Sequence, residues 1–113
     1  MNGTVLASVS LAGLAAECIA EARTADAGRS SRMLFGGFGR FRQVLVAFVE
    51  GGGLPEHGGS SAVTLQVVSG RVRVSTAGGG WEGSAGDFLV IPAERHDLLA
   101  LEEAAILLTI GTD

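Results

Sequence analysis

The chain has 113 residues, of which 47% are apolar and 18% are charged, and its net charge at pH 7 is −4. This length predicts one domain with its own core, and the single cysteine excludes an internal disulfide and a cysteine-rich zinc site. All the cations are arginines and they form no basic patch, which argues against nucleic acid as a partner. Because few side chains are charged, part of the surface should be covered, and we expect a homodimer.

The apolar stretch at residues 5–20 does not predict a signal peptide or a membrane anchor. No basic segment precedes it, Ser8, Ser10, Gly13 and Glu17 interrupt it, and it is too short to span a bilayer. We therefore expect no membrane association. The single cysteine fits a reducing compartment, so we expect a cytoplasmic protein.

The N-terminal segment, residues 1–28, is predicted to contain one helix. Ser10 is a suitable N-cap, and Gly28 lies just beyond the expected end. Apolar residues recur at helical spacing between them. They are Leu11, Leu14, Ala15, Cys18, Ile19 and Ala22. Such a helix must pack on something, and we expect it to cap a sheet or one end of a barrel.

Beyond Gly28, short apolar runs alternate with glycine-rich breaks. The runs are Ser31–Phe35, Arg40–Glu50, Ala62–Val68, Arg71–Thr76, Phe88–Pro92, His96–Leu101 and Ala104–Ile110. Short strands at regular spacing predict a sandwich or barrel, here over residues 29–113 within one structural domain. The glycine clusters, among them residues 51–53 and 78–80, lack phosphate-loop spacing and are interpreted as turns.

The run Arg40–Glu50 is apolar on both faces of a strand. Val44 and Val46 alternate with Leu45 and Ala47. One face should meet the core, while the other should meet the helix, a second sheet or a partner subunit.

Two sequence patterns then carry a family resemblance. A glycine precedes a histidine by six residues and a second glycine follows it by thirteen; later, Gly86-Asp87 opens a strand that ends in proline, with a histidine just after. The residues concerned are Gly51, His57, Gly70, Gly86, Pro92 and His96. They resemble the two motifs of the cupin family, and the resemblance covers about residues 40–111. It implies a mainly β fold, a cupin-type jelly-roll barrel with one N-terminal helix.

The resemblance also implies a metal held by three histidines and one glutamate, but this chain departs from that set. Gly59 occupies the second histidine position and Val63 the glutamate position, so His57 and His96 remain as metal ligands. Zn, Fe, Mn or Ni usually take three or four protein ligands. The candidates for a third ligand are Glu56, Gln66, Glu94 and Asp97. Strand alternation places Asp97 on the face opposite His96.

The sequence is compatible with three functions, and it does not decide whether the protein is an enzyme. The first is a small-molecule site in the barrel around His57 and His96, lined also by Gln66 and Glu94, without a full metal set. The second is a metal-dependent dioxygenase or isomerase that uses both histidines and a carboxylate. The third is a protein-interaction or regulatory module with a packed barrel.

Several other residues have simpler interpretations. Cys18 is predicted to be a small core residue, and Trp81 to pack in a hairpin or an interface. Four arginines would contact anions only if they face a pocket. They are Arg29, Arg32, Arg40 and Arg42.

Overall fold

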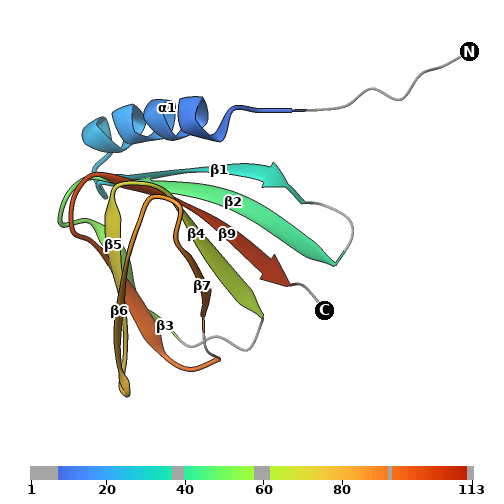
Figure 1. The fold of residues 1–113 in the computed structure, drawn as a ribbon. Coiled ribbons are helices and arrows are strands. Elements are labelled where there is room, and N and C mark those ends of the chain that lie inside the picture. The colour runs from blue at the N-terminus through green and yellow to red at the C-terminus, as the bar shows by residue number, and fades with distance from the viewer. Residues whose placement is uncertain (1–7, 37–39, 58–61, 92, 112–113) are drawn as a thin grey trace, which may run out of the picture.

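A computed structural model of the protein describes residues 8–36, 40–57, 62–91 and 93–111. The side chains of Glu56 and His57 lie outside that description. Within it, one helix lies against a barrel of two antiparallel sheets (Figure 1). No helix in these ranges is long and apolar enough to cross a membrane.

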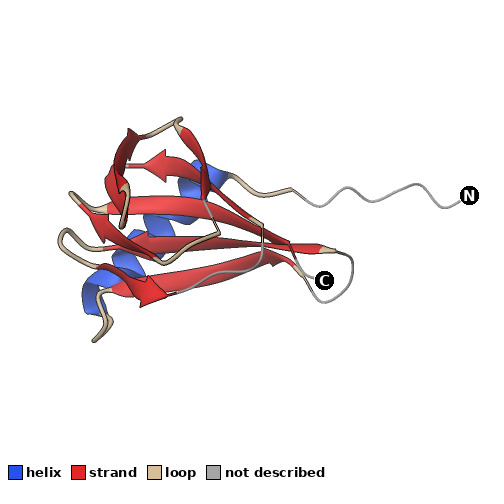
Figure 2. Ribbon diagram, turned by 90° about the horizontal axis from the view of Figure 1, so that it is seen from below, coloured by secondary structure: helices blue, strands red, loops and turns tan. Residues whose placement is uncertain are grey.

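The strands divide between a five-stranded and a four-stranded sheet. The five-stranded sheet has the order β1 (Arg29–Phe35), β2 (Phe41–Phe48), β9 (Ala104–Gly111), β4 (Val63–Ser69) and β7 (Phe88–Ile91). The four-stranded sheet has the order β3 (Gly53–His57), β8 (His96–Ala100), β5 (Arg71–Thr76) and β6 (Gly79–Ser84). Helix α1 (Leu11–Thr24) lies outside the five-stranded sheet (Figure 2). The predicted mainly β fold with one helix is confirmed.

Helix α1 begins where the sequence predicts. The Ser10 hydroxyl accepts a hydrogen bond from the Gly13 backbone N–H at 3.0 Å, which satisfies one of the free donors of the first turn. The helix buries one stripe of side chains, which are Leu14, Ala15, Cys18 and Ala22. Burial raises the pKa of the Cys18 thiol, so this side chain stays neutral and behaves as the predicted core residue.

Two ion pairs fasten α1 to the barrel. Arg23 donates two hydrogen bonds to the Glu103 carboxylate, at 2.7 and 2.6 Å. Glu21 accepts a hydrogen bond from the Ser30 hydroxyl at 2.7 Å and another from Arg32 at 2.9 Å. The Ser30 hydrogen bond and the Arg32 charge lower the pKa of Glu21, and Arg23 lowers the pKa of Glu103.

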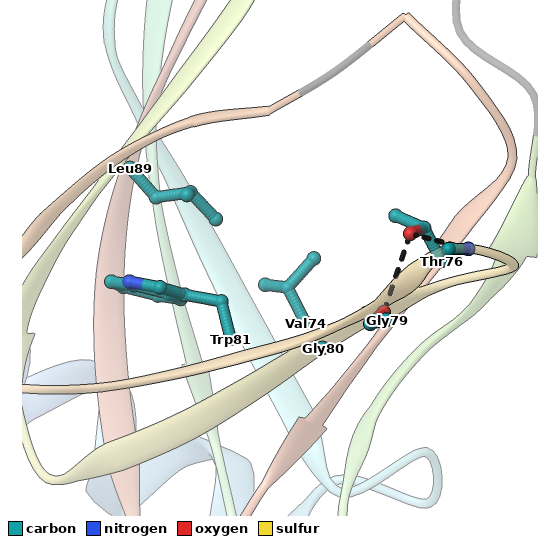
Figure 3. A pocket seen from close by; sticks show the side chains of 7 residues that line it. Val74, Thr76, Gly79, Gly80, Trp81 and Leu89 are labelled. Carbon is teal, nitrogen blue, oxygen red and sulfur yellow. Dashed lines mark hydrogen bonds between the residues drawn. The ribbon is translucent and has the colours of Figure 1, made fainter.

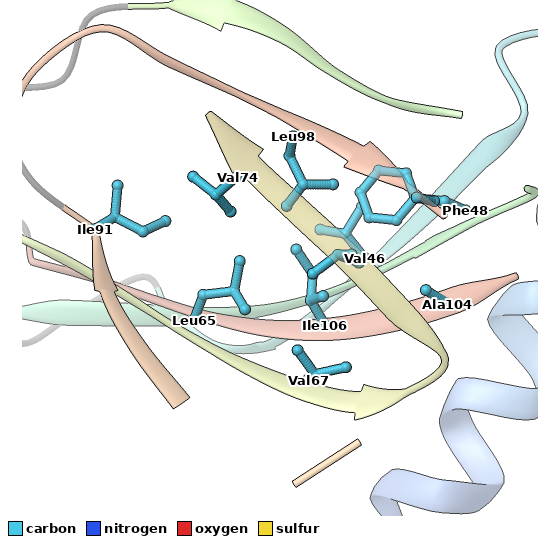
Figure 4. Close-up of a cluster of buried hydrophobic side chains, with 11 residues drawn as sticks. Val46, Phe48, Leu65, Val67, Val74, Ile91, Leu98, Ala104 and Ile106 are labelled. Carbon is cyan, nitrogen blue, oxygen red and sulfur yellow. The ribbon is translucent and has the colours of Figure 1, made fainter. Parts of the chain in front are cut away.

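Strand β2 is apolar on both faces from Val44 to Phe48, as the run Arg40–Glu50 predicts. On β2, Val46 and Phe48 point into the barrel, whereas Leu45 and Ala47 pack against α1. The inner cluster joins both sheets (Figure 4) and consists of Val46, Phe48, Leu65, Val67, Val72, Val74, Ile91, Leu98, Ala100, Ala104 and Ile106. The sequence did not decide what covers the second face of this strand. In the structure α1 covers it.

Strands β3 and β6 lie partly in glycine clusters that we interpreted as turns. That interpretation was wrong for Gly53, Gly79 and Gly80, which belong to strands. A Cβ on Gly53 would overlap the backbone of Leu98 on β8. In β6, the Trp81 ring occupies the space that a Cβ on Gly83 would need. Close approach thus explains glycine at positions 53 and 83, whereas Gly79 has a φ angle of 147° that disfavours a Cβ.

The glycines of the two family patterns, by contrast, do turn the chain. Gly51, Gly70 and Gly86 have φ angles of 83°, 77° and 95°, which disfavour any residue with a Cβ. At Gly70, between β4 and β5, a Cβ would also overlap the backbone of Glu103. Pro92 lies outside the described residues.

Candidate functional site

His96 begins β8 and faces the inside of the barrel. It is 7% exposed and is the only buried polar or charged residue in the described part of the chain. Its Nδ1 lies 2.9 Å from the backbone carbonyl oxygen of Glu94. Because a carbonyl oxygen only accepts, Nδ1 carries the proton of this hydrogen bond.

An apolar cavity of about 90 Å³ lies beside His96 inside the barrel. Both sheets contribute to its other walls, which consist of Leu54, Val63, Leu65, Val74, Ile91, Leu98, Leu108 and Ile110. Pockets for drug-sized ligands span about 300–1,000 Å³. This cavity is therefore sized for a molecule of few heavy atoms.

The pairing of β3 with β8 places the backbones of the two histidines opposite each other. His57 and His96 are register partners in the antiparallel ladder. The side chain of His57 lies outside the described residues, so its predicted pocket role stays a prediction.

The described residues do not fit the metal site that the family resemblance implies. Val63, at the glutamate position of the motif, is part of the apolar cavity wall. Asp97 alternates to the face opposite His96, as predicted. Within the described ranges, no three His, Cys, Asp or Glu side chains come together. These ranges offer His96 as the one ligand on the cavity wall, whereas a divalent ion needs three or four. Gly59 and the side chain of Glu56 lie outside those ranges.

The structure places the side chains of Gln66 and Glu94 outside the barrel interior, and the prediction that they line the pocket needs correction. Gln66 lies between Leu65 and Val67, which are fully buried in the inner cluster, so it points to the opposite face and is exposed. The side chain of Glu94 is exposed in the turn before β8. Glu94 contributes only its backbone carbonyl, to His96.

A second pocket, of about 290 Å³, opens beside Trp81 at the β5–β6 hairpin (Figure 3). Trp81 packs against the inner cluster, as does Leu89 from β7. The Thr76 hydroxyl donates a hydrogen bond to the Gly79 carbonyl and accepts one from the Gly78 N–H, both at 3.3 Å. The polar groups of the hairpin turn thus form hydrogen bonds with one another. Trp81 packs in the hairpin, as the sequence predicts.

A third pocket is a groove of about 390 Å³ beside β1. We call it the β1 groove, and its lining consists of Ala27, Arg29, Ser30, Ser31, Val44, Val46, Leu54 and Leu108. Arg29 therefore faces a pocket, a point that the sequence left undecided. Arg32 instead pairs with Glu21 on the helix side of the sheet. Strand alternation separates the two arginines, but only the tertiary structure shows which face of β1 borders a groove.

Comparisons with known proteins bear on the fold. No protein-family model and no curated protein matches the chain. Among solved structures, an RmlC-like cupin protein from Desulfovibrio desulfuricans is 19% identical, with a TM-score of 0.67 over 98% of this chain and 95% of that chain. This coverage includes the N-terminal helix.

Two further structures match the barrel. An RmlC-like cupin from Shewanella frigidimarina is 22% identical, with a TM-score of 0.68 over 77% of this chain and 78% of its own. KdgF from a Halomonas species is also 22% identical, with a TM-score of 0.68 over 76% and 82% of the two chains. At such low identity the likeness shows the fold alone. This chain therefore has the cupin fold, which its motif glycines and histidines indicated.

Proposed function

We propose that this protein binds a small, largely apolar molecule inside the barrel at His96, without a complete metal site. The observation that carries the proposal is the burial of the His96 imidazole on the wall of an otherwise apolar cavity. The hydrogen bond between Nδ1 and the Glu94 carbonyl holds this buried ring in place. One polar group on an apolar wall is the arrangement that orients a small ligand.

The cavity also bears on the alternatives. A packed barrel, as in an interaction module, would leave no such space beside His96. A dioxygenase or isomerase would need a third metal ligand beyond the two histidines, and the described residues supply none on the cavity wall. The single thiol, buried at Cys18, fits a reducing compartment, and we propose the cytoplasm.

The test combines fragment binding with metal analysis. A library of small alcohols, acids and amides, screened by ¹H–¹⁵N NMR, should shift the amides of Leu54, Val74 and Leu98. His96→Leu should abolish these shifts for polar fragments. Fragment shifts that persist unchanged in His96→Leu would contradict the proposal. So would one tightly held Zn, Fe, Mn or Ni ion per chain after expression with these metals supplied.

We also propose that a second copy of the chain covers the outer face of the five-stranded sheet beyond α1. Phe41, Phe88 and Val90 are 43%, 60% and 65% exposed there. Phe35 stacks on Phe41 with ring centroids 4.9 Å apart. The described side chains between them on this face are uncharged, and they are Gln43, Thr64, Gln66, Leu107 and Thr109. An uncharged face with aromatic edges suits a self-complementary, two-fold interface.

Sedimentation velocity tests the homodimer. The wild-type protein should sediment as a dimer at micromolar concentration, and Phe88→Glu should convert it to a monomer because two buried charges would meet at the interface. Leu99→Glu is the matched control, since Leu99 is 43% exposed on the other sheet. A monomeric wild type, or a dimer that only Leu99→Glu breaks, would refute this interface.

A further inference from the structure

The β1 groove exists because the four-stranded sheet leaves the inner face of β1 uncovered. Arg29, Ser31 and Met33 pair with Phe48, Val46 and Val44 of β2, so they share the face that carries the barrel core. Nevertheless Arg29 and Ser31 are exposed, and Met33 is 58% exposed. At about 390 Å³, the groove falls within the usual size range of small-molecule pockets, about 300–1,000 Å³.

One end of the groove carries a positive charge that no acidic side chain among the described residues neutralises. The Arg29 guanidinium donates a hydrogen bond to the Gly53 carbonyl at 3.2 Å, which links β1 to β3 across the opening. Within the described residues Arg29 forms no ion pair, whereas Arg23, Arg32, Arg71 and Arg73 each pair with a glutamate. A guanidinium has five N–H donors in a fork that matches a carboxylate. Most of this donor set is therefore available to a ligand.

The rest of the groove lining is mainly apolar. Val44 and Val46 from β2, Leu54 from β3 and Leu108 from β9 provide hydrocarbon surface. The hydroxyl of Ser31, two residues from Arg29 on the same strand face, is a second donor beside the charge. Leu54 and Leu108 also line the His96 cavity, so the two spaces adjoin at these residues.

We propose that the β1 groove binds a monocarboxylate with an apolar tail, at a site separate from the His96 cavity. The carboxylate lies on the guanidinium of Arg29 and accepts a hydrogen bond from Ser31, while the tail lies on the valines and leucines. A singly charged anion matches Arg29, the one charged side chain among the described residues that line the groove. A phosphate monoester would bring about 1.5 to 2 negative charges to that single cation.

Titration calorimetry at pH 7 with butanoate, hexanoate and octanoate tests this site. Affinity should rise about fourfold for each added CH₂ as the tail covers the groove. Octan-1-ol should bind more weakly than octanoate, because it lacks the charge that Arg29 recognises. Arg29→Gln should weaken octanoate binding roughly ten- to hundredfold. Arg29→Lys should recover part of the loss, since it keeps the charge but not the fork.

Two further variants locate the effect. Arg42→Gln removes an equal charge from β2 outside the groove lining, and it should leave octanoate affinity unchanged. His96→Leu should leave it unchanged too, which separates this site from the interior one. The proposal is overturned if Arg29→Gln binds octanoate as the wild type does. It is equally overturned if Arg42→Gln weakens binding as much, or if the alcohol and the carboxylate bind alike.

Discussion

The His96 cavity and the β1 groove share Leu54 and Leu108, yet they differ in size and charge. The cavity measures about 90 Å³ and its one polar wall residue is buried. The groove measures about 390 Å³ and its arginine is exposed. Both lie on the inner face of the same sheet. Where the two sheets face each other, their side chains leave only the small His96 cavity; beside the edge strand β1, the described side chains leave the larger groove. The packed core thus leaves room for a ligand of few atoms, and the margin leaves room for a larger one.

The largest effect should be on the free energy of unfolding, and it should distinguish the wall of the His96 cavity from the wall of the β1 groove. Leu65 lies on the cavity wall and is 0% exposed to solvent. Leu65→Ala should lower the free energy of unfolding by about 2–5 kcal/mol, because it removes core contacts and leaves a void. Val44→Ala, on the half-buried groove wall, should cost only about 1 kcal/mol. Urea unfolding measures both, and equal costs would remove the distinction between core and margin.

Replacing His96 or Arg29, the polar residues of the two sites, should change the free energy of unfolding less. His96→Leu puts an apolar side chain on an apolar wall, and the Glu94 carbonyl lies in an exposed turn where water can replace its donor. We expect a change of at most about 1 kcal/mol in the free energy of unfolding. Arg29→Gln loses one exposed hydrogen bond and should change it by a similar or smaller amount. A loss above about 3 kcal/mol for His96→Leu would show that the imidazole is structural.

The smallest effect on stability should come from the ion pairs that hold α1 on the outer face of the five-stranded sheet. The pKa values of Glu21 and Glu103 are lowered in the folded protein by the partners that hold α1. This stabilisation is present above the ordinary glutamate pKa of 4.5 and is lost as the pH falls through the lower folded values. The urea midpoint should therefore fall on acidification from pH 7 to pH 3, while the groove keeps its shape.

Glu103→Gln should reduce this acid dependence, because it removes the carboxylate that Arg23 stabilises. Glu102→Gln is the neighbouring control, since Glu102 forms no ion pair among the described residues. Equal acid dependence in wild type and Glu103→Gln would show that the Glu103 carboxylate does not contribute to the pH dependence of stability.

Much of the fold followed from local pattern. Helical spacing and the Ser10 cap predicted α1, and alternation in Arg40–Glu50 predicted a sheet buried on both faces. Strands β3 and β6 were missed because glycine usually marks turns. Gly53 and Gly83 instead make room for the Leu98 backbone and the Trp81 ring, which come close only in the folded barrel.

The sequence by itself determined the cupin fold, the helix and the loss of the glutamate position at Val63, since these depend on residue type and spacing along the chain. The tertiary structure decided which face each strand turns inward. It moved Gln66 and the Glu94 side chain out of the predicted pocket, buried His96, and brought Arg29 to a groove. Alternation along a strand distinguishes two faces but does not say which one meets the core. Only packing against another sheet or helix settles that choice.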